Sequence, residues 1–100
     1  MAIFEERYCL SFEGSPQKDP FFWEDHLKML KRYILDAYDL FSKQTITSHT
    51  DYVDVISGYK KAMSAMVNKD VKEFKKQINK SVTALNKLVY DLELSSIQDD

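Results

Sequence analysis

The chain has 100 residues, of which 44% are hydrophobic and 30% charged, and its formal net charge at pH 7 is −2. A chain of this length forms one domain, residues 1–100, which buries about 60–65% of its unfolded surface without a disulfide or a structural metal. Its one cysteine excludes an intramolecular disulfide, its apolar runs are too short to cross a bilayer, and the acidic residues near its N-terminus exclude a secretory signal. We therefore expect a single-domain, cytoplasmic protein.

The first segment, residues 2–13, fits two periodicities. Read as a strand, it places four apolar side chains on one face: Phe4, Tyr8, Leu10 and Phe12. Read as a helix, it aligns Phe4, Tyr8 and Phe12, which are spaced by four residues, and Gly14 stands where a helix would end. A lone strand leaves its backbone groups unpaired unless it pairs with a second chain, whereas a helix satisfies its own. We therefore predict a short helix here, with a partner-seeking strand as the alternative.

The first long helix is predicted at residues 20–43. Asp19 is a favourable N-cap, and Pro20 at the first helical position gives up only an N–H that has no partner there. The apolar residues that follow recur every three or four positions: Trp23, Leu27, Leu30, Ile34, Ala37 and Phe41. The next stretch, residues 45–50, is rich in Thr and Ser, which favour caps over helix interiors, so we predict that it is a connection.

Two further helices are predicted at residues 50–68 and 70–94, each with its own apolar stripe. The short turn between them makes them antiparallel neighbours, and Asp70 followed by Glu73 resembles a capping box at the start of the later helix. Gly58 lies inside the earlier helix, at a cost of about 1 kcal/mol relative to Ala. It indicates either a close approach of two helices or mere tolerance.

Few turn-forming residues separate these elements, because the chain has only two Gly and two Pro. A set of strands would need more of them. The residues after the last helix, 95–100, are predicted to fray. The predicted fold class is therefore all-α: a small antiparallel helical bundle of three long helices plus the short N-terminal segment.

Residues that could carry out catalysis or hold a metal are sparse. His26 and His49 are far apart, and neither has the spacing that would place two metal ligands on one helix face. Gly14 and Gly58 are isolated, so there is no glycine-rich phosphate loop. Cys9 fits a small buried hydrophobe better than an activated nucleophile. We therefore predict that the protein is not an enzyme and uses no cofactor or metal.

The first long helix carries more apolar surface than one packed face requires. Three consecutive aromatic residues at its start fan over about 200° and cannot all face one core. Aromatic residues and Met carry much of the binding energy at protein interfaces. The predicted partner-binding residues are Phe21, Phe22, Trp23, Met29, Tyr33 and, on the third long helix, Tyr90. The alternative is that the first helix is central and is contacted on several sides.

Lysines are concentrated in residues 60–87, which hold eight lysines and two acids, a local net charge of +6, so the rest of the chain carries −8. Four of them form a predicted basic ridge at the start of the third long helix: Lys69, Lys72, Lys76 and Lys80. Such a ridge could orient an acidic protein surface or follow the phosphates of a nucleic acid. The acidic pI of about 5.6 and the absence of arginine from this helix favour the protein.

These patterns together predict a non-catalytic protein–protein interaction module of the adaptor, inhibitor, immunity or chaperone type. Its predicted partner is another protein, with an acidic surface, bound through the aromatic face of the first helix. A homodimer is a second expectation. The alternative function is a nucleic-acid-associated protein that uses the lysine ridge.

Overall fold

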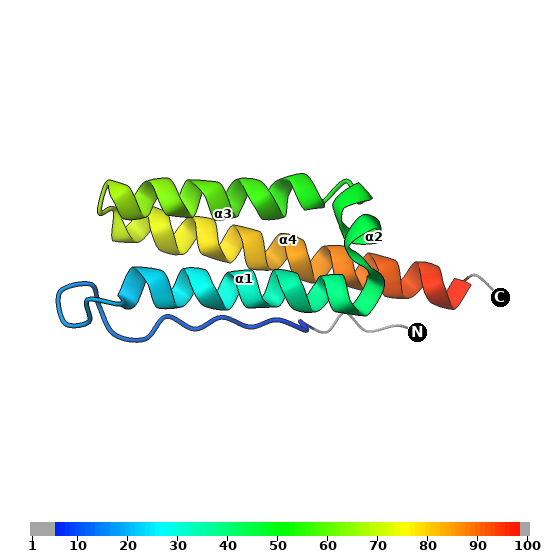
Figure 1. Cartoon of the computed structure of the whole chain (residues 1–100), viewed down its shortest axis with the longest axis horizontal. Helices are drawn as coiled ribbons and strands as arrows, with labels where there is room; N and C mark the ends of the chain where they lie inside the picture. The colour runs from blue at the N-terminus through cyan, green and yellow to red at the C-terminus, as the bar shows by residue number, and fades with distance from the viewer. Residues whose placement is uncertain (1–5, 99–100) are drawn as a thin grey trace.

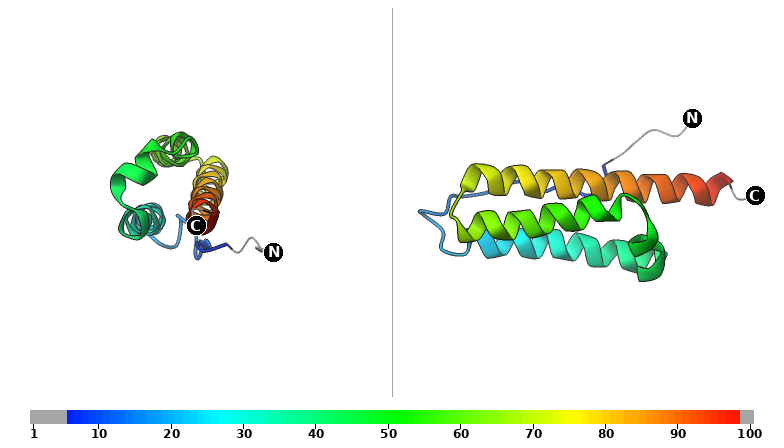
Figure 2. Two further views of the ribbon diagram at one scale, coloured as in Figure 1. Left: turned by 90° about the vertical axis from the view of Figure 1, so that its right-hand side faces the viewer. Right: turned by 90° about the horizontal axis from the view of Figure 1, so that it is seen from above.

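The computed structural model describes residues 6–98, and within them it contains four helices and no strand (Figure 1). The helices are α1 (Phe22–Phe41), α2 (Lys43–Ser48), α3 (Tyr52–Val67) and α4 (Val71–Gln98). The long helices α1, α3 and α4 lie side by side with α3 antiparallel to the other two, and the short α2 crosses one end (Figure 1 and Figure 2). This arrangement confirms the predicted all-α bundle. In the described range, no helix combines the length and the apolarity needed to cross a membrane.

The boundaries of the long helices lie close to those predicted. α1 falls within 20–43 and α3 within 50–68, while α4 begins one residue after the start of 70–94 and continues to Gln98. α4 therefore extends past the predicted helix end at residue 94 as far as Gln98. The last two residues lie outside the described part of the chain.

The stretch 45–50, predicted to be a connection, instead supplies most of α2. Ser42 starts this helix: its φ of 89° turns the chain away from α1, and its Oγ accepts a hydrogen bond of 3.2 Å from the Thr45 N–H. Ile46 is fully buried and anchors α2 to the bundle. Burial of this side chain outweighs the low helix propensity of the surrounding Thr and Ser residues.

The turn between α3 and α4 is a left-handed helix cap. Lys69 has a φ of 57°, its N–H donates to the Met66 carbonyl at 3.1 Å, and the Asp70 N–H donates to the Ala65 carbonyl at 2.9 Å. These are the two hydrogen bonds of a Schellman motif. The Asp70 carboxylate then accepts a bond of 3.1 Å from the Glu73 N–H, so the predicted role of Asp70 as the cap of α4 is confirmed.

Helices α3 and α4 share the most extensive contact in the bundle and are very close at Gly58. A Cβ atom added there would lie 2.8 Å from the Ser81 Cβ and 2.9 Å from the Gln77 carbonyl oxygen. Beside this point the Ser81 hydroxyl donates to the Val55 carbonyl at 2.7 Å. Gly58 therefore permits a close approach of two helices, which is the first of the two interpretations of its sequence position.

The hydrophobic core lies between the three long helices. Aromatic residues occupy one end of it, where the fully buried rings of Phe22 and Phe74 have centroids 5.9 Å apart. The rest of the core is mainly aliphatic, and its large buried members include Leu30, Ile34, Ile78, Leu85, Leu88 and Val89. Each of the long helices buries one stripe, as the periodicity predicts.

Residues 6–13, which we call the strap, form neither the predicted helix nor a strand. The strap runs extended along the bundle between α1 and α4, antiparallel to both, and closes the fourth side (Figure 1 and Figure 2). The helix predicted at 2–13 is therefore wrong over the described residues 6–13. Residues 2–5 of that prediction lie outside the described range. The helix is unnecessary because side chains of the bundle bind the backbone of the strap.

Candidate functional site

A groove of about 700 Å³ runs along the outer side of α3 and α4. Four lysines line it: Lys61 from α3, and Lys76, Lys80 and Lys87 from α4. All four side chains are exposed. Gly58 also lines the groove, buried where the two helices are very close. We call this feature the lysine groove.

The sequence predicts a basic ridge at the start of α4: Lys69, Lys72, Lys76 and Lys80. All four are exposed, but only Lys76 and Lys80 line the lysine groove, whereas Lys69 lies in the turn before α4. Sequence reasoning missed Lys61 and Lys87. Lys87 follows Lys80 by two helical turns and so shares its face, a signal that the sequence contains. Lys61 joins the set only because α3 packs against α4.

Two acidic residues, Asp51 and Asp54, line the same groove. Because α3 and α4 are antiparallel and Gly58 meets Ser81, these acids lie towards the Lys87 end of the groove. The groove therefore presents lysines along its length and carboxylates at one end. A ligand that offers charges of both signs complements it better than a uniform row of phosphates.

The six predicted partner-binding residues do not form one surface: Phe21, Phe22, Trp23, Met29, Tyr33 and Tyr90. Phe22 is fully buried, so its prediction as a partner contact is wrong. Trp23 is half-buried and packs edge-on against Phe74, with ring centroids 4.9 Å apart. Phe21 is 60% exposed and Met29 is 37% exposed. The alternative interpretation, in which α1 is central and contacted on several sides, explains Phe22 and Trp23.

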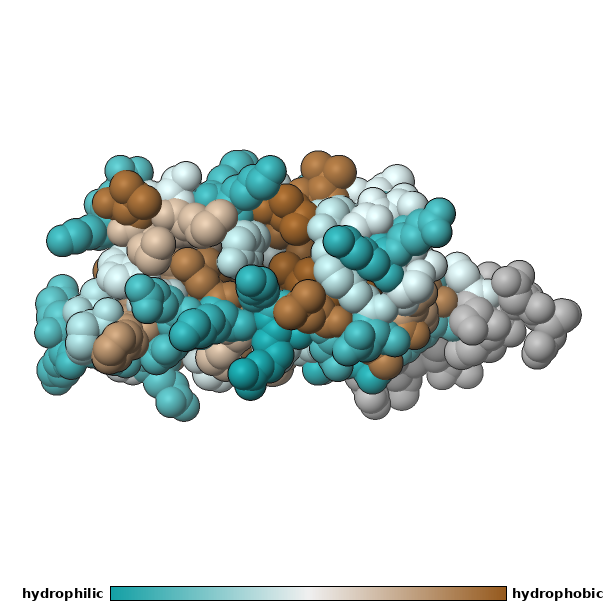
Figure 3. Space-filling model, in the orientation of Figure 1, coloured by the Kyte–Doolittle hydropathy of each residue, from teal (hydrophilic) through white to brown (hydrophobic). Residues whose placement is uncertain are grey.

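Tyr33 and Tyr90 are both half-buried. The Tyr33 hydroxyl donates to the Cys9 carbonyl at 2.7 Å, so this residue holds the strap. Further exposed apolar side chains lie on α1 and α3: Leu35, Leu40, Val53 and Val67. Figure 3 shows apolar side chains emerging among polar ones over these helices. This mixed surface is chemically less defined than the lysine groove.

The strap is held by a buried amide on α4. Asn86 is 4% exposed, its Oδ1 accepts the Tyr8 N–H at 2.7 Å, and its Nδ2 donates to the Tyr8 carbonyl at 2.8 Å. One side chain therefore satisfies both backbone groups of Tyr8, as a neighbouring strand would. The sequence contains no signal for this pair, because the two residues are 78 positions apart.

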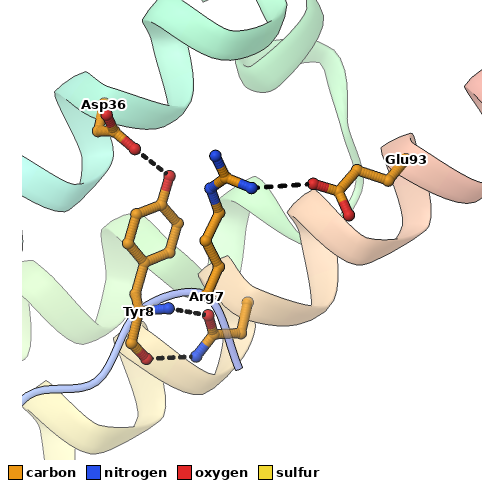
Figure 4. Close-up of polar contacts among 5 residues, drawn as sticks. Arg7, Tyr8, Asp36 and Glu93 are labelled. Carbon is orange, nitrogen blue, oxygen red and sulfur yellow. Dashed lines mark hydrogen bonds and ion pairs between the residues drawn. The ribbon is translucent and has the colours of Figure 1, made fainter. Parts of the chain in front are cut away.

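The Tyr8 side chain is buried between the strap and α1, and its hydroxyl donates to the Asp36 carboxylate at 2.7 Å (Figure 4). Burial, followed by the hydrogen bond to Asp36, raises the pKa of Tyr8 well above its ordinary value. Arg7 beside it pairs with Glu93 of α4 at 3.2 Å, with both side chains about half exposed (Figure 4). An exposed pair of this kind contributes about 0–1 kcal/mol, so Tyr8 is the stronger anchor.

The histidines have structural partners. The Nδ1–H of His26 donates to the Phe22 carbonyl at 2.6 Å. The Asp51 N–H donates to His49 Nδ1 at 3.1 Å, which places the ring proton on Nε2, where it donates to Asp91 at 2.8 Å. Across the part of the chain that the structure describes, no group of three or more His, Cys, Asp or Glu residues is arranged to hold a metal ion.

No protein-family model matches this chain, and no curated protein or solved structure shows significant similarity to it.

The hydroxyls of Tyr38 and Tyr52 are hydrogen-bonded at 2.7 Å and join the end of α1 to the start of α3. Burial, with this bond, raises the pKa of Tyr38 from 10.0 to about 12. The unfolded chain therefore loses this proton first, so the stabilisation is complete below pH 10 and is lost as the pH rises through 12. We expect the free energy of unfolding, measured in urea, to fall over this window, and to fall less in Tyr38→Phe. Equal slopes in the two proteins would contradict this assignment.

Proposed function

We propose that this protein is a non-catalytic protein–protein interaction module that binds an acidic partner through the lysine groove. The observation that carries the proposal is the convergence of four exposed lysines from two helices on one groove. Grooves between helices accept an amphipathic helix or an extended segment of a partner. Lysines along such a groove pair with the carboxylates of the partner, accelerate its association and fix its orientation.

The mixed charge of the groove favours a protein over a nucleic acid. Asp51 and Asp54 would repel phosphates at one end, whereas a protein segment can place a lysine or arginine there. No arginine lines the groove, although arginine is the residue that most often reads bases. Nucleic acid remains the second candidate, because the lysines of α4 lie on one helix face and could follow a phosphate backbone.

The proposal includes a cytoplasmic location. Cys9 is an exposed free cysteine on the strap, so its interpretation as a small buried hydrophobe is wrong. Such a thiol stays reduced in the cytoplasm, whereas in an oxidising compartment it would be open to intermolecular pairing. Phe21 and Met29, which are exposed on α1, do not line the lysine groove and are not part of this proposal.

The double variant Lys76→Glu/Lys80→Glu tests the proposal. Both side chains are exposed, so the fold should survive, while the reversed charges face the acidic partner. Juxtaposed like charges cost several kcal/mol, so we expect affinity to fall more than tenfold. The measurement is affinity capture from a lysate of the source cells, quantified by mass spectrometry, with melting temperatures checked by circular dichroism.

The matched control is Lys28→Glu/Lys31→Glu, which makes the same charge change at exposed positions of α1. It should leave capture intact. A protein captured equally by both double variants would contradict binding through the groove. If capture instead disappears on nuclease treatment, and binding of a duplex DNA probe falls steeply with salt, the nucleic-acid candidate replaces the protein partner.

A further inference from the structure

The strap lies on the bundle as a bound peptide would. Among the described residues, no backbone–backbone hydrogen bond involves residues 6–13. The backbone of the strap is instead bound by side chains of the helices: Asn86 holds both polar groups of Tyr8, and Tyr33 donates to the Cys9 carbonyl. At the far end, the Glu13 N–H donates to His26 Nε2 at 3.4 Å. These hydrogen bonds involve only backbone groups of the strap and therefore do not depend on its side chains.

Alternate side chains of the strap supply the specificity. Tyr8 is buried and donates to Asp36, and its ring lies 5.1 Å from that of Tyr33. Leu10 is partly buried against the core. Phe12 packs against Phe74, with ring centroids 6.4 Å apart. An aromatic-x-apolar-x-aromatic segment in an extended conformation fits this site, because alternate side chains of such a segment point the same way.

The contacts of the strap do not require that it belong to the same chain. The strap is joined to α1 by a short tether that turns at Gly14, where φ is 75°. The Lys18 and Asp19 N–H groups both donate to the Ser15 carbonyl and complete the turn. If the tether were extended instead, the same strap would reach the groove of a neighbouring molecule and make the same contacts. The conformation of the tether determines whether the strap binds its own bundle or that of a neighbouring molecule.

We propose that the groove between α1 and α4 is a binding site for an extended aromatic-x-apolar-x-aromatic segment, and that a second copy of this chain supplies it. Two copies then exchange their straps reciprocally and form a dimer. A short tether gives the strap an effective local concentration in the millimolar range, which keeps the protein monomeric at lower concentrations. None of the residues that hold the strap, Asn86, Tyr33 and His26, lines the lysine groove, so this proposal does not rest on the proposed function.

The double variant Gly14→Pro/Ser15→Pro tests this proposal in the full-length chain. Proline cannot adopt the positive φ of Gly14, and with the native Pro16 the change creates three consecutive prolines, which form an extended rod. The strap can then no longer make the turn at Gly14 that leads it back onto its own bundle. We expect this variant to sediment at twice the monomer mass of 11.7 kDa, with an unchanged helical circular dichroism spectrum.

A third change in the strap itself distinguishes exchange from other dimers. Adding Tyr8→Ala to the tether variant removes the main anchor without altering any helix, and should return the protein to a monomer. Asn86→Leu in the same background, which removes both backbone bonds from the groove side, should do the same. A tether variant that stays monomeric into the millimolar range overturns the proposal. So does a dimer that persists when Tyr8 is replaced.

Discussion

Replacing Phe22 by Ala is expected to destabilise the protein by about 3–5 kcal/mol. The ring is fully buried at the aromatic end of the core, where its centroid lies 5.6 Å from that of Trp23, 5.9 Å from that of Phe74 and 4.5 Å from that of His26. Its removal leaves a cavity that these rings cannot fill without losing their own contacts. Since a domain of this size is stable by about 5–15 kcal/mol, the variant should be partly unfolded at moderate temperature.

The matched control is Phe21→Ala, one residue earlier and 60% exposed, which should change the free energy of unfolding by less than about 0.5 kcal/mol. Thermal and urea unfolding followed by circular dichroism measure both. A cost below about 1 kcal/mol for Phe22→Ala would mean that another residue fills the core here. Equal costs for the two variants would mean that α1 begins in a different rotation.

Phe21 and Phe22 also show how much of the packing of α1 can be predicted from the sequence. The sequence predicts that three consecutive aromatic residues at the start of a helix cannot all face one core. This prediction is confirmed, because Phe21 points outward. Which of the three is buried depends on the rotation of α1 against α4, whose Phe74 lies about fifty positions away. Periodicity predicts the three long helices because each carries a stripe of its own. Periodicity does not determine how one helix is rotated about its own axis relative to its neighbour.

The predictions for the strap and for α2 are wrong for a common physical reason. The sequence disfavours an extended segment because its backbone would be unpaired, but Asn86 and Tyr33 supply the partners from distant helices. In the same way, the burial of Ile46 against the bundle offsets the weak helix propensity of α2. In both segments a tertiary contact replaces a local one. Local propensity is least reliable where a segment is short and a single anchor decides its conformation.

The lysine groove was half predicted. The four-residue spacing of Lys72, Lys76 and Lys80 indicates one exposed face of α4, and that face is present. The groove needs a second wall, which α3 supplies through Lys61, and it needs α3 to lie close to α4. The sequence indicates this close approach of α3 and α4 only through a single glycine inside a helix, Gly58. That glycine could equally be merely tolerated, and the structure decides the question by placing it against Ser81.

Gly58→Ala is expected to destabilise the protein by about 1–3 kcal/mol, although alanine is the better helix former by about 1 kcal/mol. The new Cβ would lie 2.8 Å from the Ser81 Cβ and 2.9 Å from the Gln77 carbonyl. Neither atom can rotate away, because one is fixed to the α4 backbone and the other belongs to it. α3 must therefore move outward, which lengthens the 2.7 Å bond from Ser81 to Val55. Urea unfolding measures the loss.

A double-mutant cycle with Ser81→Gly isolates the steric cause. Ser81→Gly alone is destabilising, because it removes a hydrogen bond and places glycine in a helix, but it also removes the Cβ nearest to the new methyl group. The combined variant should therefore be more stable than the sum of the two losses predicts, with a coupling above about 0.5 kcal/mol. If Gly58→Ala instead stabilises the protein by its helix propensity, the two helices lie further apart than this contact requires. The floor of the lysine groove would then be deeper, and a bulkier partner segment could enter it.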